Sequence, residues 1–587
     1  YFRALEDGTP AAGKFEGWPD SLADFKLLDP CCGSGHFLVA AFLMLVPMRM
    51  AAEGLSAREA VNRVLAENIH GLELDPRCVE IAVFAVALEA WRYPAASGKP
   101  LGVREIPVPN IACCGLKVAA KAQDWESLVP DDDPNARGLR EGLRQLHQTF
   151  AQAPLLGSLL DPRQAYRSDL IAVDFDHLTA LLGRALSLES GDQDEGAWEA
   201  AISAKGLLEV AQILSGTYHL IITNVPYLAR GKHSEHLVSF ADRYYFDARK
   251  DLAAIFTARI HRILHGGTAC LVIPQNLFQL TGYTDFRKQL LRQSTIHTFA
   301  RLGPRAFETI SGENVSVALT IFEDAMPKDG HLISAIEASG LGTAIEKAHA
   351  LRFGQLVSID QNRQLSNPDS RLILSENDRA EGLLSDVSDG IHGLGTKDSP
   401  MFIRNFWELP LRTSDWEFVQ ASIRSQGDWA GMESVIYWQQ GNGELHERAS
   451  VGKAILAGAM AHSSPGVLVS PVGEMRCALY HGALFDKSTA VISPIDEDDV
   501  AAIYCYVQSQ DFKKEIKLLD SKVAVTNKTL VKVPFDLGHW KNIADERYPN
   551  GLPKPYSNNP TQWIFLFHSK LSDEPLQVAV ARLLGYT

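Results

Sequence analysis

The chain has 587 residues, 46% of them hydrophobic, and a formal net charge of -15. This length predicts two to four domains, and the acidic balance excludes a surface that is positive all over while allowing a local basic groove. The eight cysteines show no C-x-x-C spacing, and neither a targeting segment nor a membrane span stands out. We therefore expect a cytoplasmic protein with reduced thiols, no metal and no membrane partner.

The first third of the chain alternates short apolar runs with longer amphipathic ones. Strands are predicted at 25–28 and 69–74, and helices at 37–49, 57–67 and 79–91. This alternation is typical of a parallel α/β sheet. Residues 117–214 are instead rich in Ala and Leu and are broken by acidic loops. They predict a helical insertion.

The sheet is expected to be completed after the insertion. Strands are predicted at 219–223, 268–273 and 315–322, with helices at 252–264 and 285–291. From about Phe402 the sequence becomes β-rich and aromatic, which predicts a separate domain. The chain starts at Tyr1 and ends within a helical pattern, so both ends are expected to be trimmed. The predicted parts are an α/β core at 1–116 and 215–330, the insertion at 117–214, a connector at 331–401, a β-rich domain at 402–540 and a truncated C-terminal segment at 541–587.

A glycine-containing loop follows the first predicted strand. In LLDPCCGSGHF, Gly33 and Gly35 let the backbone turn tightly and approach a ligand at the carboxyl end of a strand. A dinucleotide-binding loop would carry a third glycine where Leu38 stands, which weakens the case for a nicotinamide or flavin enzyme. The next strand ends in GLELDP, where Glu73 can accept hydrogen bonds from two ribose hydroxyls. The two segments together favour a nucleoside pocket over a plain turn and a solvated strand end.

A second polar segment, HLIITNVPYLARGK, ends another predicted strand. The side-chain carbonyl of Asn224 and the backbone carbonyl of Val225 can accept both hydrogens of an aromatic amine such as adenine N6 and so favour a tetrahedral nitrogen. Pro226 biases Val225 toward an extended conformation, and Tyr227 offers a ring on which a splayed base can stack. No general base is required. Taken alone, the tetrapeptide is as compatible with an ordinary turn.

In this order, DPCCGSGHF, GLELDP and TNVPY resemble the methionine-donor, ribose and catalytic motifs of gamma-type N6-adenine DNA methyltransferases. The likeness extends to DLAAIFTARIHRILHGGTACLVIPQNLF, and SPGVLVSPVGEMRCALYHGALFDKSTAVISP is similar to the target-recognition domain of that group. The long insertion and the segment GLGTKDSPMFIRNFWEL resemble the large methylases of type IIG restriction and of BREX and DISARM phage defence, with DISARM methylases the nearest.

The resemblance implies a Rossmann-like S-adenosyl-L-methionine-dependent sheet with a β-rich C-terminal target-recognition domain. It also implies a site-specific adenine-N6 methyltransferase that acts on a flipped adenine of double-stranded DNA in restriction-modification or phage defence, with other defence subunits as further partners. The catalytic residues would be Asn224, Val225, Pro226 and Tyr227. The cofactor-binding residues would be Asp29, Pro30, Gly33, Ser34, Gly35, Phe37, Glu73, Leu74 and Gly115.

Three departures from the family pattern bear on these expectations. Val225 stands where the family has a proline, and we expect function to survive because that position acts through its backbone carbonyl. The third strand, NIACCGLKV, ends without an acidic residue or asparagine, so backbone groups near Gly115 or Leu116 would replace it. The aromatic motif that precedes the glycine loop in the family is not recognisable in residues 1–28.

Basic residues interleaved with aromatic ones predict contact with DNA phosphates beside unstacked bases. They occur in the loop after the catalytic motif, in the segment RYYFDARK and in a late lysine cluster. The candidate DNA-binding residues are Arg230, Lys232, Arg243, Lys250, Lys513, Lys514 and Lys517. For each lysine alone, a solvated surface charge is the competing interpretation.

Two other classes of function stay open. An Asn-Pro-Tyr type loop also resembles those of enzymes that methylate an RNA base or a protein glutamine, although the size of the β-rich region favours DNA. A non-catalytic DNA-binding defence subunit is the second alternative. The joint presence of Asn224, Pro226 and Tyr227 weighs against it.

Overall fold

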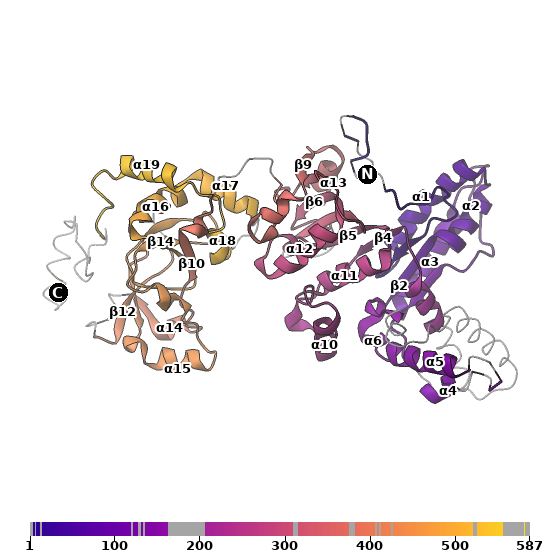
Figure 1. Cartoon of the computed structure of the whole chain (residues 1–587), viewed down its shortest axis with the longest axis horizontal. Helices are drawn as coiled ribbons and strands as arrows, with labels where there is room; N and C mark the ends of the chain where they lie inside the picture. The colour runs from indigo at the N-terminus through magenta and orange to yellow at the C-terminus, as the bar shows by residue number, and fades with distance from the viewer. Residues whose placement is uncertain are drawn as a thin grey trace. The chain divides into compact units, whose positions relative to one another are not determined.

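The computed structural model divides the chain into two compact units, Tyr1–Leu374 and Ser375–Thr587. It describes residues 4–162, 206–374, 382–555 and 580, apart from gaps at 6, 12–14, 119–120, 127–128, 130, 133–135, 309–314, 406–407, 410–412, 424–426 and 520–524. Figure 1 shows the elements of each unit. The boundary between the units lies inside the predicted connector, whose two halves therefore belong to different units.

A nine-stranded sheet forms the centre of the first unit, in the order β3-β2-β1-β4-β5-β7-β6-β8-β9. The strands are β1 (Leu27–Asp29), β2 (Ile69–Glu73), β3 (Asn110–Cys113), β4 (Leu220–Asn224), β5 (Thr268–Pro274), β6 (Thr295–Gly303), β7 (Val317–Glu323), β8 (Leu332–Glu337) and β9 (Val357–Asp360). Strands β1 to β5 run parallel, and β7 is antiparallel to both β5 and β6. The carboxyl ends of β1 to β6 therefore lie at one edge, called here the carboxyl edge.

Helices cover both faces of this sheet. The helices that follow β1 and β2 are α1 (His36–Glu53), α2 (Ala57–Arg63), a π-helix (Val64–Asn68) and α3 (Pro76–Arg92). On the other face lie α11 (Leu252–Leu264) and α12 (Thr284–Gln293), with α10 (Glu235–Tyr244) before them. Helix α13 (Ala344–Phe353) packs against Ala300 of β6, on the face opposite to α11 and α12. Leu27 packs with the first group and Leu28 with the second, because successive strand side chains point to opposite faces. The sheet is thus doubly wound.

Helix α1 is long and apolar enough to cross a membrane when judged by length and composition alone. Its Leu38, Phe42 and Val46 are fully buried, in a core cluster shared with β1 and β2. This burial is the pattern of a core helix, whose apolar residues meet a sheet.

The described residues of the predicted insertion are helical. They form α4 (Ala122–Glu126), α5 (Ala136–Phe150), α6 (Ala153–Leu156) and a further helix at 206–215. Residues 163–205 of the insertion lie outside the described residues. Leu143, Phe150 and Val210 are fully buried in the same core cluster as α11, so these helices cover the sheet as well as interrupting the core sequence.

The prediction of a connector at 331–401 is wrong for its first part. Strand β8 pairs with β6, and β9 pairs with β8, which extends the sheet beyond the predicted core. The strand β6 was also missed, because its buried face carries polar residues: His297 lies 3.1 Å from Glu323, and Arg301 lies 3.1 Å from Glu337. Strand formation here depends on long-range pairing, which a local pattern does not reveal.

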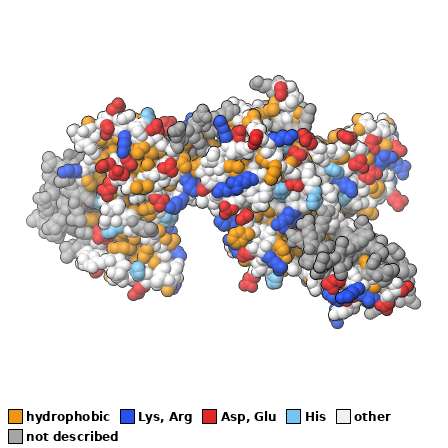
Figure 2. Space-filling view, in the orientation of Figure 1, with side chains coloured by type: hydrophobic (Ala, Val, Ile, Leu, Met, Phe, Trp, Pro, Cys, Tyr) orange, Lys and Arg blue, Asp and Glu red, His pale blue; other side chains and the backbone are white. Residues whose placement is uncertain are grey.

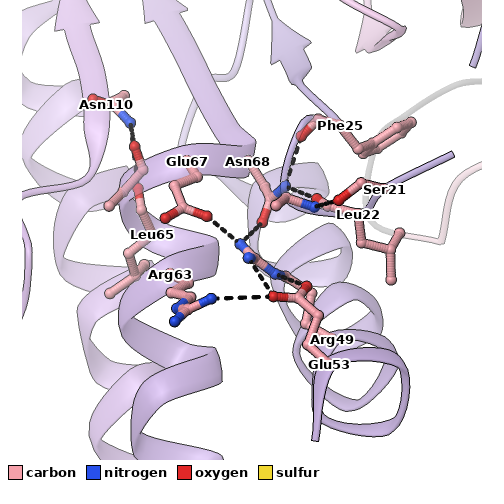
Figure 3. Close-up of polar contacts among 12 residues, drawn as sticks. Ser21, Leu22, Phe25, Arg49, Glu53, Arg63, Leu65, Glu67, Asn68 and Asn110 are labelled. Atoms are coloured by element: carbon pink, nitrogen blue, oxygen red, sulfur yellow. Dashed lines mark hydrogen bonds and ion pairs between the residues drawn. The ribbon is translucent and has the colours of Figure 1, made fainter. Parts of the chain in front are cut away.

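A buried arginine ties the glycine-loop helix to the strand that carries Glu73. The Arg49 side chain is fully buried, and its guanidinium donates to Glu53, Glu67 and Asn68 over distances of 2.6 to 3.1 Å. Asn68, just before β2, donates in turn to backbone carbonyls of the segment that enters β1 (Figure 3). The starts of β1 and β2 are thereby fixed to α1.

We expect Arg49→Met to destabilise the first unit by about 3 kcal/mol, because two carboxylates and an amide are left without their buried partner. Hydrogen exchange of the α1 and β2 peptides, together with urea unfolding, measures the effect. Arg63→Ala is the matched control: Arg63 pairs with the same Glu53 at 3.3 Å but is half exposed, so its removal should cost less than about 0.5 kcal/mol. Equal effects of the two changes would contradict the assignment.

The second unit contains two four-stranded sheets, ordered β10-β17-β14-β15 and β11-β13-β12-β16. The strands are β10 (Ser388–His392), β11 (Ile403–Asn405), β12 (Trp416–Gln420), β13 (Ser434–Tyr437), β14 (Gly466–Val469), β15 (Cys477–Tyr480), β16 (Leu484–Phe485) and β17 (Ala490–Pro494). The helices are α14 (Ser399–Phe402), α15 (Glu444–Ser450), α16 (Val500–Gln508), α17 (Gln510–Leu519), α18 (Asn527–Leu530) and α19 (Leu537–Arg547). The predicted start at Phe402 is too late, since β10 pairs with the distant β17.

Candidate active site

The sheet topology brings the two polar motifs together at the carboxyl edge. Asp29 is the last residue of β1, and Asn224 is the last residue of β4. The two strands are neighbours, with Leu28 in register with Ile221. The glycine loop and the catalytic tetrapeptide, which are about 190 residues apart in the chain, therefore extend from adjacent strands.

The glycine loop adopts the conformation for which glycine was expected. Gly33 has φ 52° and Gly35 has φ 85°, both in the left-handed region that favours glycine. A Cβ at Gly35 would lie 3.0 Å from the Cβ of Ala82 in α3, whereas a Cβ at Gly33 would meet nothing within 4 Å. Gly35 thus permits close helix packing, and Gly33 leaves open space for a ligand.

The Glu73 carboxylate accepts hydrogen bonds from two loops, the glycine loop and the loop that follows β2. Its Oε2 accepts from Gly33 N at 2.9 Å, and its Oε1 accepts from Leu74 N at 2.7 Å and Asp75 N at 3.1 Å. A carboxylate has about four acceptor positions, so Oε2 keeps one for a ribose hydroxyl rather than the two bonds predicted. A Cβ at Gly115 would lie 2.2 Å from Leu74 O, so glycine is needed there for the end of β3 to approach β2.

Asp29 is a buried carboxyl group with an acceptor to spare. Its side chain is 1% exposed, and burial raises its pKa to about 7. Oδ1 accepts from Cys31 N at 3.1 Å, while Oδ2 has no hydrogen-bond partner among the described residues. The Thr223 hydroxyl of β4 lies beside it without completing a hydrogen bond. A buried oxygen left in this state suits a cationic ligand group.

The remaining predicted cofactor residues shape the loop. Pro30 is buried, Phe37 is half-buried in the first turn of α1, and Ser34 Oγ lies 3.1 Å from His36 Nδ1. Burial also raises the pKa of Cys114 to about 12, which keeps that thiol neutral. Among the residues that the structure describes, no group of three His, Cys, Asp or Glu side chains could hold a metal ion.

The four residues of the tetrapeptide at 224–227 differ in exposure. Asn224 and Pro226 are exposed, Tyr227 is half-buried and Val225 is 2% exposed. The Tyr227 hydroxyl donates to Asn224 Oδ1 at 3.2 Å, so the amide oxygen is already oriented. Burial raises the pKa of Tyr227, which keeps the hydroxyl protonated as that donor.

The loop that carries the tetrapeptide is fixed to the start of α11. Ala229 forms an antiparallel bridge with Asp251, and Leu252 N donates to Leu228 O at 2.9 Å. The carboxylate of Asp251 also caps α11 by accepting from Ala253 N at 2.9 Å. These contacts hold the tetrapeptide on a rigid element, as precise positioning of an amine would require.

Two aromatic residues at the carboxyl edge were missed from the sequence. Tyr283 follows β5, is half-buried, and has its pKa raised to about 12 by burial and by the charge of Asp251, which also acts on Tyr227. Phe307 follows the end of β6 and is half-buried. The shared influence of Asp251 places Tyr283 near Tyr227, whereas Phe307 is placed only by the strand that it follows.

The four candidate DNA-binding residues of the first unit differ in their surroundings. Arg230 pairs with Asp242 at 2.8 Å, so its charge is already used within the protein. Lys232, Arg243 and Lys250 are exposed. Figure 2 shows basic, acidic and hydrophobic side chains close together over α10, where Arg243 lies.

The late lysine cluster lies on α17 and divides into two kinds. Lys513 and Lys517 line a cavity of about 720 Å³ together with Arg476 and Arg547. Lys514 is exposed and is not among the described lining residues. Arg476 pairs with Glu474 at 3.1 Å, so the other three cations supply most of the positive charge at the cavity. A cluster of this kind suits a polyanion better than separate surface charges.

Comparison with known proteins bears on the resemblance predicted from the motifs. Residues 67–307 match the Eco57I restriction-modification methylase family. This match includes Glu73, the tetrapeptide at 224–227 and Phe307, and begins after the glycine loop.

Two curated relatives are both called adenine-specific methyltransferases. PglX of Lacticaseibacillus casei (strain Zhang) is 28% identical over 304 residues, which are 51% of this chain and 24% of the relative. BrxX of Escherichia coli O9:H4 (strain HS) is 28% identical over 321 residues, which are 52% of this chain and 25% of the relative. The chain thus spans about a quarter of the length of these relatives.

A solved structure is similar in fold. The type IIL restriction-modification enzyme MmeI in complex with DNA matches 90% of this chain and 66% of its own, with a TM-score of 0.50 and 11% identity. The predicted resemblance to adenine-specific methyltransferases of restriction and defence systems is confirmed by the family and the two relatives. The finer likeness to DISARM methylases stays a prediction.

Proposed function

We propose that the chain is a site-specific DNA methyltransferase that transfers a methyl group from S-adenosyl-L-methionine to adenine N6, in a restriction or phage-defence system. The observation that carries the proposal is the placement of the Gly33 and Glu73 loops beside Asn224, on neighbouring strands at one edge. The similarity to PglX and BrxX supports it.

The residues at the carboxyl edge fit S-adenosyl-L-methionine. Glu73 keeps one acceptor position for a ribose hydroxyl, and Gly33 leaves open space for close backbone approach. The free Oδ2 of Asp29 can accept from the methionine ammonium. When bound, the cofactor would supply a methyl group attached to a positively charged sulfur.

Asn224 and Val225 would act on the target amine. The Asn224 side-chain oxygen and the Val225 carbonyl accept its two hydrogens, which makes the nitrogen lone pair available for attack. Transfer would join the methyl carbon to N6 and leave the sulfur as the thioether of S-adenosylhomocysteine, and the proton lost from N6 would pass to water. Tyr227 is a positioning residue for the Asn224 oxygen, and its ring, with those of Phe307 and Tyr283, would hold the extruded base.

Duplex DNA is the substrate that we propose, with the second unit reading its sequence and the cations of the 720 Å³ cavity holding its phosphates. The test supplies labelled cofactor with duplex DNA, RNA or a glutamine-containing protein, and identifies the product by digestion and mass spectrometry. N6-methyladenine from DNA supports the proposal. Label in RNA or glutamine, or binding of DNA without any transfer, favours the alternative classes and overturns it.

Glu73→Ala should weaken S-adenosyl-L-methionine binding by about 1 to 3 kcal/mol, the scale for removing a charged acceptor. The change removes the proposed ribose contact and also releases Gly33 N. Calorimetry measures the affinity, with Glu80→Ala, exposed on α3, as a control that should bind normally. An unchanged affinity in Glu73→Ala would move the ribose contact to Asp75.

Cofactor affinity should rise with pH through the pKa of Asp29. Burial holds that pKa near 7, so the carboxyl is neutral at lower pH and must lose its proton before it can pair with an ammonium. Between about pH 5.5 and 7.5 we expect an increase of up to about 20-fold; above about pH 7.7 the ammonium begins to lose its own proton. Asp29→Asn should bind weakly without this dependence. A flat profile in the unchanged chain would place the ammonium elsewhere.

A further inference from the structure

The first unit has a second pocket, away from the carboxyl edge. It has a volume of about 520 Å³ and is lined by the end of α10 and the residues that follow it, by α11 and by α12. Figure 1 shows these three helices. Asp324, which follows β7, also lines the pocket, and β7 ends level with the start of β5 at the opposite edge. None of the described lining residues belongs to the proposed catalytic or cofactor sets.

Two guanidinium groups are held at this pocket by aromatic rings. Arg262 lies 4.3 Å from the ring centre of Tyr245 and donates through Nη2 to Tyr244 O at 2.7 Å. Arg243 lies 5.2 Å from the ring centre of Tyr244. A guanidinium fixed in this way loses little freedom when it binds a phosphate, for which its planar fork is well suited.

A third basic group lies one residue from Arg262. His261 Nδ1 is 2.6 Å from Asp324 Oδ1, and this hydrogen bond raises the pKa of His261. Asp324 also accepts from Gly266 N at 3.0 Å, so its charge is largely satisfied within the protein. Asp324 therefore opposes an anion less than an unpaired carboxylate would. Asp247, the second acidic residue that lines the pocket, is exposed to solvent, which screens its charge.

The walls of the pocket offer surfaces for a base. Phe246 is 60% exposed, with the Arg249 guanidinium 3.6 Å from its ring centre, which leaves one face for a base. The Tyr244 ring is half-buried. On the α12 side, Gln289 Nε2 donates to Gln293 Oε1 at 3.1 Å, and both side chains are exposed. Aromatic faces bind bases by stacking, and amide groups can hydrogen-bond base edges.

We propose that this pocket binds a nucleoside phosphate, with Arg262 and Arg243 on the phosphate and the Tyr244 and Phe246 rings against the base. The volume of about 520 Å³ lies in the range of small-molecule sites. The site is separate from the methyl-transfer centre and goes beyond the proposed function. Its ligand is either a free nucleotide or one nucleotide of a bound strand.

The test titrates the full chain with deoxyadenosine monophosphate, thymidine monophosphate and inorganic phosphate. Saturating S-adenosylhomocysteine is present throughout to fill the cofactor site. Nucleotide should bind more tightly than phosphate, and Arg262→Ala and Arg243→Ala should each weaken it about tenfold. Arg292→Ala, exposed on α12 and outside the described lining, should bind as the unchanged chain does.

A second arm distinguishes the sources of the nucleotide. This arm adds a single-stranded oligonucleotide of five nucleotides as a competitor. If it competes with the mononucleotide and binds more weakly to the same variants, the pocket takes a nucleotide of a strand. If it does not compete, the ligand is a free nucleotide. Because Arg262 also contacts Tyr244, Gln289→Leu provides a second lining change that leaves this hydrogen bond in place.

Three results overturn the proposal: no binding under these conditions, equal affinity for phosphate and nucleotide, or binding that none of the lining changes weakens. The titrations are repeated on Asn224→Ala, which lies outside the pocket. Nucleotide binding there is expected to be unchanged, so failure of methyl transfer and failure of this site are separate observations.

Discussion

Asn224→Ala should reduce methyl transfer by about 10² to 10³ in kcat while leaving the affinity for S-adenosyl-L-methionine nearly unchanged. In the proposed mechanism the amide oxygen of Asn224 would stabilise charge that develops on the target amine, whereas Asp29, Gly33 and Glu73 would hold the donor. A label-transfer assay under saturating cofactor, paired with calorimetry, measures both quantities on the same preparation.

Two further variants define what the tetrapeptide does. Tyr227→Phe removes only the hydroxyl that donates to Asn224 Oδ1 at 3.2 Å, so we expect kcat to fall about tenfold, the scale of one hydrogen bond. Val225→Pro should be active, because this position contributes its backbone carbonyl. A folded but inactive Val225→Pro would show that the second acceptor is misplaced, and full activity in Asn224→Ala would refute the mechanism.

Replacing both Lys513 and Lys517 by Ala should weaken DNA binding more than replacing any other candidate DNA-binding residue. Both side chains line the cavity that Arg476 and Arg547 also line, so their removal takes two charges from the proposed phosphate site. The slope of log affinity against log salt should become shallower by about 0.9 for each DNA phosphate that the variant no longer neutralises. Binding isotherms at several salt concentrations measure it.

The structure supplies an internal control for this experiment. Lys514 lies on the same helix, α17, and is exposed away from the described lining residues. Lys514→Ala should therefore change the salt slope much less than the double replacement of Lys513 and Lys517 does. The methylated sequence should stay the same in both variants, since phosphate contacts do not read bases. A changed target sequence would make these lysines readers, and equal slopes would make them solvated surface charges.

Several features of this protein could be predicted from the sequence because their chemistry is local. A left-handed backbone at Gly33 and Gly35 follows from a strand that must turn at once into a helix. The hydrogen bond between Asn224 and Tyr227 was not predicted, although the two residues are only three positions apart. The helix predicted at 252–264 has the bounds found for α11, because its apolar period and capping Asp251 are contained in the segment.

Other features were decided by tertiary structure, because each depends on residues far apart in the chain. The strands β6, β8 and β9 form through pairing that their own sequences indicate weakly. Glu73 has one free acceptor position rather than several because Gly33, 40 residues away, uses another. Arg230 forms an ion pair with Asp242. Lys513 and Lys517 line the cavity and Lys514 does not, which depends on the side of α17 that faces the cavity. Composition and spacing identified the charged and aromatic residues, but only the three-dimensional packing determined their partners.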